Sequence, residues 1–143
     1  MMNANNNAGG FVAGTDLARG WVRTGWALTA LTFAFLVLAS ALPKFIGHAS
    51  VAEAMDPLGW PVRYALWIGI AEIAIAILYL VPRTSLLGLV LLTGLLGGAM
   101  ATHLRVGSPL FSHTLFGVYL GLFAWAGLWL REPRLRALLP FRR

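Results

Sequence analysis

Long apolar stretches alternate with short polar segments along the chain after residue 20. A helix that crosses a bilayer needs about 20 mainly apolar residues, and in lipid it satisfies its own backbone hydrogen bonds. Four stretches meet this requirement: residues 25–42, 62–81, 84–104 and 113–130. The pattern predicts an all-α membrane protein, with a bundle of four transmembrane helices over residues 21–131.

The composition supports this class and argues against several others. Only 11% of the residues are charged, and the mean hydropathy is +0.76, whereas soluble domains average about 25% charged residues. The chain has no cysteine, so it cannot itself form disulfides or carry out thiol exchange. The net charge of +6 comes from residues at the ends of the apolar stretches rather than from one basic face, which argues against nucleic-acid binding.

The basic residues favour one side of the predicted bundle. One side holds Lys44, Arg63 and Arg105, and the other holds Arg19, Arg23, Arg83, Arg131, Arg134, Arg136, Arg142 and Arg143. Because arginine and lysine are enriched on the cytoplasmic side, we predict a multi-pass protein of the cell membrane with both termini in the cytoplasm.

The two ends of the chain are predicted to lie outside the bundle. Residues 1–20 are rich in Asn, Gly and Ala and predict a mobile tail, and residues 132–143 predict a basic cytoplasmic tail. The run Ala39-Ser40-Ala41 resembles the end of a signal peptide, but the apolar run before it is long enough to span, so we expect the first span to be retained.

Two local patterns predict further structure. The Ser50-x-x-Glu53 spacing is that of a capping box and predicts a short interfacial helix in the loop of residues 45–61. In the third span, Gly94 and Gly98 have the small-xxx-small spacing that lets membrane helices approach closely. We therefore predict that this span is the packing spine of the bundle.

Glu72 is the most informative single residue, because it lies near the middle of the second span. A charged carboxylate at the bilayer centre costs about 2.5–3.5 kcal/mol on insertion scales, so Glu72 is expected to face the bundle interior. Two interpretations remain open at this point: a contact for a proton or ligand, or a hydrogen-bonded structural group between helices.

Other polar residues gather near the non-cytoplasmic surface. His103 lies about 15 Å nearer that surface than Glu72 when the spans are counted at 1.5 Å per residue, which argues against a direct Glu72–His103 pair. Residues at its level predict a polar mouth, made of Lys44, His48, Arg63, His103, Arg105 and His113. The mouth is suited to an anionic or quinone-like headgroup, or alternatively to anchoring helix ends at the interface. The candidate ligand-binding residues are Glu72, His103, Arg105, Lys44 and His113.

The sequence carries no motif of nucleophilic, phosphate-binding or paired-carboxylate catalysis. It also lacks the short ligand spacings of a metal site. We therefore name no catalytic residue and no metal ligand, and we expect a protein that is not an enzyme on its own.

Several runs resemble the DoxX-like family of membrane proteins over about residues 30–139. These runs are Gly69-Ile70-Ala71-Glu72-Ile73, Val81-Pro82-Arg83-Thr84, Gly97-Gly98-Ala99-Met100-Ala101-Thr102-His103-Leu104-Arg105-Val106-Gly107 and Trp125-Ala126-Gly127-Leu128-Trp129-Leu130-Arg131-Glu132-Pro133-Arg134. The resemblance implies a four-helix integral membrane protein, with Lys44, Glu72 and His103 at polar positions seen in such proteins.

The resemblance also implies an accessory role. Some relatives in the wider family are membrane subunits of a thiosulfate:quinone oxidoreductase, and others are associated with membrane complexes that handle thiol or oxidative stress. On this ground we expect an accessory subunit in the lipid bilayer, with quinone as the candidate cofactor and an oxidoreductase as the candidate partner; a homo-oligomer is also open. The alternatives are a stand-alone small-molecule or proton-handling protein that uses Glu72, and a structural membrane scaffold.

Overall fold

Four long apolar helices make up most of the computed structural model, which describes the backbone of residues 5–138 and the side chains of residues 19–137. Every regular element in this range is helical. The segments long and apolar enough to cross a membrane are Arg19–Phe45, Val62–Leu80, Ser85–Arg105 and Leu110–Arg131. The predicted fold class and the four predicted spans are therefore confirmed.

The first span is one continuous helical rod with a change of winding near its end. It consists of α1 (Asn5–Ala34), a π-helical segment (Phe35–Ala41) and α2 (Leu42–Phe45). Pro43 lacks an N–H group, and its ring would collide with the carbonyl four residues earlier in an α-helix. The π turns before Pro43 remove this conflict, so the helix continues past the predicted end at residue 42.

The N-terminal region differs from the sequence-based expectation. The predicted mobile tail covers residues 1–20, yet α1 begins at Asn5. Once a helix is nucleated, each added residue gains a hydrogen bond, so the apolar span can extend its helix into this polar segment. Residues 1–4 lie outside the described part of the chain.

A short helix, α3 (Ala49–Met55), lies in the loop between the first two spans, as predicted. Its start differs from the prediction, because the N-cap is His48 and not Ser50: the backbone N–H of Ser50 donates to His48 Nδ1 at 3.2 Å. Val51 and Met55 of α3 pack on Ala65 and Ile68, forming a small apolar cluster separate from the main core.

The remaining elements form two antiparallel hairpins. A 3₁₀ turn (Val62–Tyr64) leads into α4 (Ala65–Leu80), and α5 (Ser85–Arg105) follows after a short turn. A π turn (Leu110–Thr114) precedes α6 (Phe116–Arg131), and α7 (Pro133–Leu138) ends the described chain. The predicted C-terminal tail thus begins with α7, and its residues 139–143 lie outside the described range.

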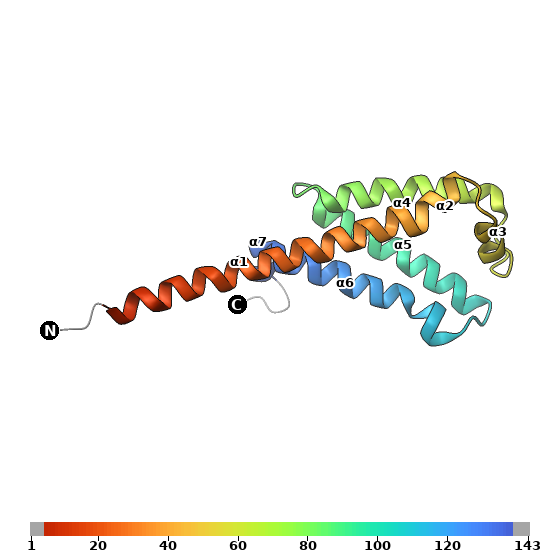
Figure 1. Cartoon of the computed structure of the whole chain (residues 1–143). Helices are drawn as coiled ribbons and strands as arrows, with labels where there is room; N and C mark the ends of the chain where they lie inside the picture. Colours follow the sequence, from red (N-terminus) through yellow and green to blue (C-terminus); the bar gives the residue numbers. More distant parts are fainter. Residues whose placement is uncertain (1–4, 139–143) are drawn as a thin grey trace.

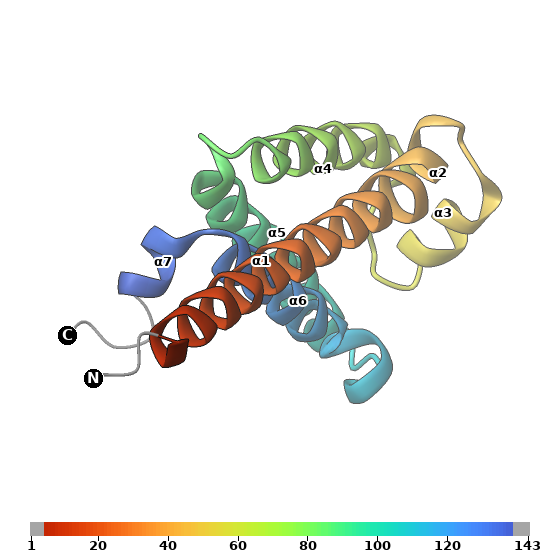
Figure 2. The same ribbon diagram turned by 60° about the vertical axis from the view of Figure 1, so that its left-hand side comes forward.

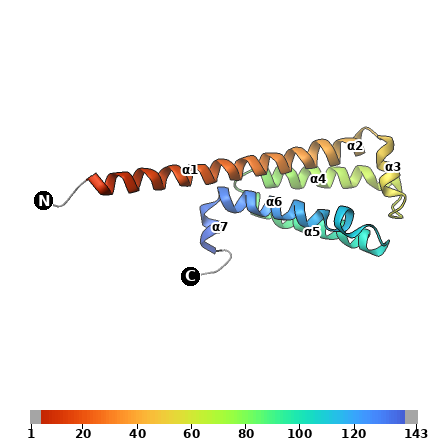
Figure 3. The same cartoon turned by 60° about the horizontal axis from the view of Figure 1, so that its bottom comes forward.

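Helices α1, α4, α5 and α6 lie lengthwise beside one another (Figure 1). The start of α1 and the short α7 lie at one end of the bundle, and α3 lies at the other (Figures 2 and 3). The main core contains Leu36, Leu89, Leu92 and Leu128 around the fully buried Tyr79. The Tyr79 hydroxyl donates to the Ala124 carbonyl at 2.8 Å, which ties α4 to α6.

The outer faces of the spans are apolar. Leu31, Leu38, Trp67 and Leu122 each expose more than 60% of their surface. Such a surface is unfavourable in water and suits acyl chains. Together with the four spans, it implies that the protein contacts a lipid bilayer.

The predicted packing spine is wrong for the described chain. A Cβ atom added at Gly94, Gly97 or Gly98 would meet nothing within 4 Å. Close helix approach occurs instead at other glycines, such as Gly117 against Met100 on α5 and Gly127 against the Tyr79 hydroxyl. The small-xxx-small spacing reports an uncrowded helix face, but it does not state which neighbour that face meets.

Candidate functional site

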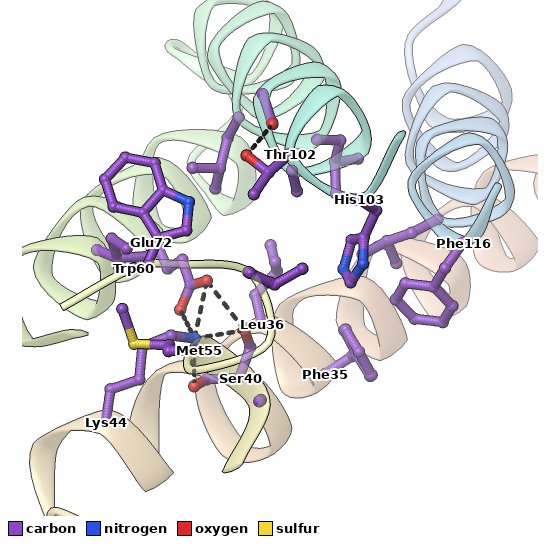
Figure 4. Close-up of a pocket in the computed structure, with 18 residues that line it drawn as sticks. Phe35, Leu36, Ser40, Lys44, Met55, Trp60, Glu72, Thr102, His103 and Phe116 are labelled. Carbon is purple, nitrogen blue, oxygen red and sulfur yellow. Dashed lines mark hydrogen bonds and ion pairs between the residues drawn. The ribbon is translucent and has the colours of Figure 1, made fainter. Parts of the chain in front are cut away.

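A cavity of about 520 Å³ lies inside the bundle, in the half nearer α3. The π segment, α4, α5 and α6 form its walls, and the loop that carries α3 covers one end (Figure 4). Most of its lining is apolar, including Leu36, Met55, Ile68, Leu95, Ala99, Phe116 and Leu120. Its polar lining residues are Ser40, Lys44, Trp60, Glu72, Thr102 and His103.

Lys44 and Glu72 form an ion pair in the cavity wall. Lys44 Nζ lies 2.9 Å from Glu72 Oε2 and 3.1 Å from Oε1. Ser40 completes the cluster: its hydroxyl donates to Glu72 Oε1 at 2.9 Å, and its carbonyl accepts from Lys44 Nζ at 2.8 Å. Figure 4 shows the three side chains together on one side of the cavity. The pair thus compensates the charge of Glu72 inside the apolar bundle.

The position of Lys44 corrects the sequence-based prediction, which placed it in a surface mouth away from Glu72. A Cβ atom at Gly69 would lie 3.4 Å from Lys44 Cβ and 3.2 Å from the Phe45 ring. The end of α2 is therefore level with Gly69, one helical turn from Glu72. Lys44 therefore lies beside Glu72 in the wall of the cavity, with its side chain only 16% exposed.

His103 lines the same cavity as the ion pair. Its Nδ1 lies 3.0 Å from Ser108 Oγ, and its ring centroid lies 5.7 Å from that of His113. Within the described residues, no hydrogen bond joins His103 to Glu72, in line with the expected separation of the two. His113 pairs with Ser112 Oγ at 2.8 Å and does not line the cavity.

The other residues of the predicted mouth are dispersed. Arg105 Nη2 donates to the Leu58 carbonyl at 2.6 Å and so connects the end of α5 to the loop over the cavity. Arg63 stacks over the Tyr64 ring at 5.0 Å, and His48 caps α3. Of the candidate ligand-binding residues, the structure brings Lys44, Glu72 and His103 to one cavity and leaves Arg105 and His113 beside it.

The model of the DoxX-like family matches residues 27–127, which is most of the chain and includes Lys44, Glu72 and His103. The protein belongs to the DoxX-like family. No curated protein and no solved structure matches the chain. The expected family is thus confirmed for this DoxX-like protein.

Sequence reasoning missed several residues of the DoxX-like cavity, above all Ser40, Trp60 and Thr102. For Ser40 a signal was present, because it precedes Lys44 by four residues and residues four apart share a helix face. For Trp60 no local pattern indicates that the loop folds over the bundle.

Small residues give the cavity part of its width. Gly98 and Ala99 of α5 line it, and the space next to the Gly98 Cα is open. The run of small residues in α5 therefore leaves room inside this DoxX-like bundle. The described residues contain no group of three or more His, Asp or Glu that could hold a metal ion.

Proposed function

We propose that this DoxX-like protein is an accessory membrane subunit that binds a lipophilic small molecule of the quinone class in the cavity between its helices. The observation that carries the proposal is the cavity of about 520 Å³ with a compact polar cluster in an apolar lining. Small-molecule sites are clefts of about 300–1,000 Å³, mostly apolar, with a few placed polar groups that orient the ligand.

The candidate residues take different roles in this proposal. Glu72, Lys44 and His103 contact the head of the ligand, because all three line the cavity. Arg105 holds the loop that covers it, through the Leu58 carbonyl. His113 supports the site through its ring contact with His103.

We further propose that the protein lies in the cell membrane with both termini in the cytoplasm. An even number of spans puts both ends on one side, and the arginine-rich end of the bundle, with Arg83, Arg131 and Arg134, favours the cytoplasm. A reporter fused after Arg143 is expected to be active only in the cytoplasm. Activity on the outer side would contradict this orientation.

The test of ligand binding uses purified protein in mild detergent and equilibrium dialysis against a short-chain quinone–quinol pair. We expect saturable binding of about one molecule per chain. Gly98→Leu places a large side chain into the cavity and is expected to abolish binding. Gly94→Leu, one turn away on α5, lies outside the lining and is the matched control. Absence of saturable binding, or equal loss in both variants, would contradict the proposal.

A structural scaffold is the second candidate, because the ion pair of Glu72 with Lys44 also satisfies both groups without any ligand. A scaffold predicts no saturable binding in the experiment above. The partner oxidoreductase is proposed from the family alone, and cross-linking in native membranes followed by mass spectrometry tests it. Recovery of lipid only would contradict a stable partner.

A further inference from the structure

We infer that the cavity selects ligands whose polar head donates hydrogen bonds, such as a phenol or the hydroxylated, reduced form of a quinone, over ligands whose head only accepts them. This inference rests on the proposed function and names the ligand class of the same site. It follows from the hydrogen-bond donors and acceptors of the polar lining. A buried polar group favours a ligand that supplies the hydrogen-bond partner it does not yet have.

The ammonium of Lys44 has no proton left for a ligand. It has three donors and four acceptors within 3.1 Å: the Ser40 carbonyl and hydroxyl at 2.8 and 3.0 Å, and the two Glu72 oxygens at 2.9 and 3.1 Å. A ligand that only accepts hydrogen bonds would have to take a proton from one of these partners, and the partner would lose its own bond.

The two hydroxyl groups of the lining have also used their protons. Ser40 Oγ donates to Glu72 Oε1 at 2.9 Å, and Thr102 Oγ1 donates to the Gly98 carbonyl at 2.9 Å. Each hydroxyl has one proton and two lone pairs. Towards the cavity, Ser40 and Thr102 therefore offer lone pairs only.

Unused acceptor capacity remains on Glu72. Its Oε1 accepts from Ser40 and Lys44, but Oε2 accepts from Lys44 alone. A carboxylate oxygen can accept two hydrogen bonds, so Oε2 has room for one more. A ligand hydroxyl that donates to Oε2 makes a charge-assisted bond, which is stronger than a neutral one.

Two further polar groups lie nearer the loop. The Trp60 indole is a donor, and the residue is 42% exposed in the loop region. His103 takes either role through Nε2, because its Nδ1 partner is a serine hydroxyl that can donate or accept. These groups suit the second oxygen of a ligand, while the ligand group next to Glu72 must be a hydroxyl that donates its proton to the carboxylate.

The charges of the site favour a neutral head. Lys44 and Glu72 compensate each other at 2.9 Å, so neither an anion nor a cation gains a free counter-charge. This distinguishes a neutral hydroxyl from an ammonium group, which also donates. An aromatic amine that is protonated at the assay pH is therefore expected to bind more weakly than the phenol of the same shape.

The test compares three molecules of one shape: tetramethylhydroquinone, tetramethylquinone and the dimethyl ether of the hydroquinone. Dissociation constants are measured on wild-type protein in mild detergent under anaerobic, reducing or non-reducing conditions. A hydrogen bond to a charged group corresponds to about 10- to 150-fold in affinity, so we expect the hydroquinone to bind at least about 10-fold tighter than the other two. Equal binding of the quinone and the hydroquinone would overturn the inference and leave the proposed function standing.

Two variants make the test specific to Glu72. Glu72→Gln keeps the shape but can turn an amide N–H to the cavity, so the preference for the hydroquinone is expected to fall to less than about threefold. Gly94→Leu is expected to keep the full preference. A Glu72→Gln protein that binds all three molecules like the wild type would refute the assignment, and a wild type that binds none would refute the proposed function together with it.

Discussion

The ion pair of Lys44 and Glu72 yields the sharpest prediction on stability. Its two side chains are 16% and 9% exposed and lie 2.9 Å apart. Removal of one partner from a buried pair costs about 3–5 kcal/mol, because the other charge stays behind uncompensated, whereas replacing both partners by neutral groups is often nearly neutral. A double-mutant cycle with Lys44→Met and Glu72→Gln measures this difference directly.

The structure places the single variants at the low end of that range. After Lys44→Met, the Ser40 hydroxyl still donates to Glu72 Oε1, at 2.9 Å. After Glu72→Gln, Lys44 still donates to the Ser40 carbonyl and hydroxyl, at 2.8 and 3.0 Å. We therefore expect each single variant to lower the free energy of unfolding by about 3 kcal/mol, and the double variant to lie within about 1 kcal/mol of the wild type.

Reversible unfolding in mixed detergent micelles, followed by circular dichroism, gives the four free energies of the cycle. Ser40→Ala in each background tests the role of the serine. It is expected to lower the free energy of unfolding of both single variants further. A double variant that loses the sum of the two single losses would refute the reasoning, because the charges would then not compensate each other. Single losses below about 1 kcal/mol would show a pair that is solvated, as at a protein surface.

Three further predictions concern packing and the covered end of the cavity. Gly117→Leu is expected to destabilise the bundle by at least about 2 kcal/mol in the same unfolding assay, since its side chain would collide with Met100, while Gly98→Leu is expected to leave stability within about 1 kcal/mol. Arg131→Gln is expected to cost about 2–3 kcal/mol in that assay, because the guanidinium donates to the Tyr79 carbonyl at 2.6 Å at the end of α4. Arg105→Gln removes the hydrogen bond to the loop over the cavity. We expect ligand release at least about threefold faster in a stopped-flow displacement assay, with an unchanged free energy of unfolding. Equal release rates in the variant and the wild type would contradict a role of this bond in closing the site.

Much of the fold follows from the sequence, because the bilayer imposes length and polarity on each span. The helices α4, α5 and α6 lie where the apolar runs predict them, and the interior position of Glu72 follows from the cost of a charge in lipid. The identity of the residue that pairs with Glu72 does not follow from the sequence. Counting residues along each span treats all helix ends as level, and it therefore predicts Lys44 at the surface, whereas the structure places it 2.9 Å from Glu72.

The spacing of the small residues also does not predict which of them contact a neighbouring helix. Gly94, Gly98, Gly117 and Gly127 all lie in apolar helices, yet only the last two meet a neighbouring helix closely. Which face of a helix points to a neighbour depends on the path of the connecting loops. The loop that carries α3 folds over the bundle, and its Trp60 lines the cavity. This is a tertiary contact, and no periodic pattern in the sequence predicts it.

A single proline links the local sequence to the site. In a continuous α-helix, the ring of Pro43 would collide with the carbonyl four residues earlier. The segment before Pro43 is instead π-helical, with the Leu42 N–H bonded to the Val37 carbonyl, five residues back. Leu36, Ser40 and Lys44 are spaced four residues apart along this rod, and all three line the cavity. The helix therefore continues past its predicted end at residue 42, and Lys44, beyond Pro43, meets Glu72 together with Ser40.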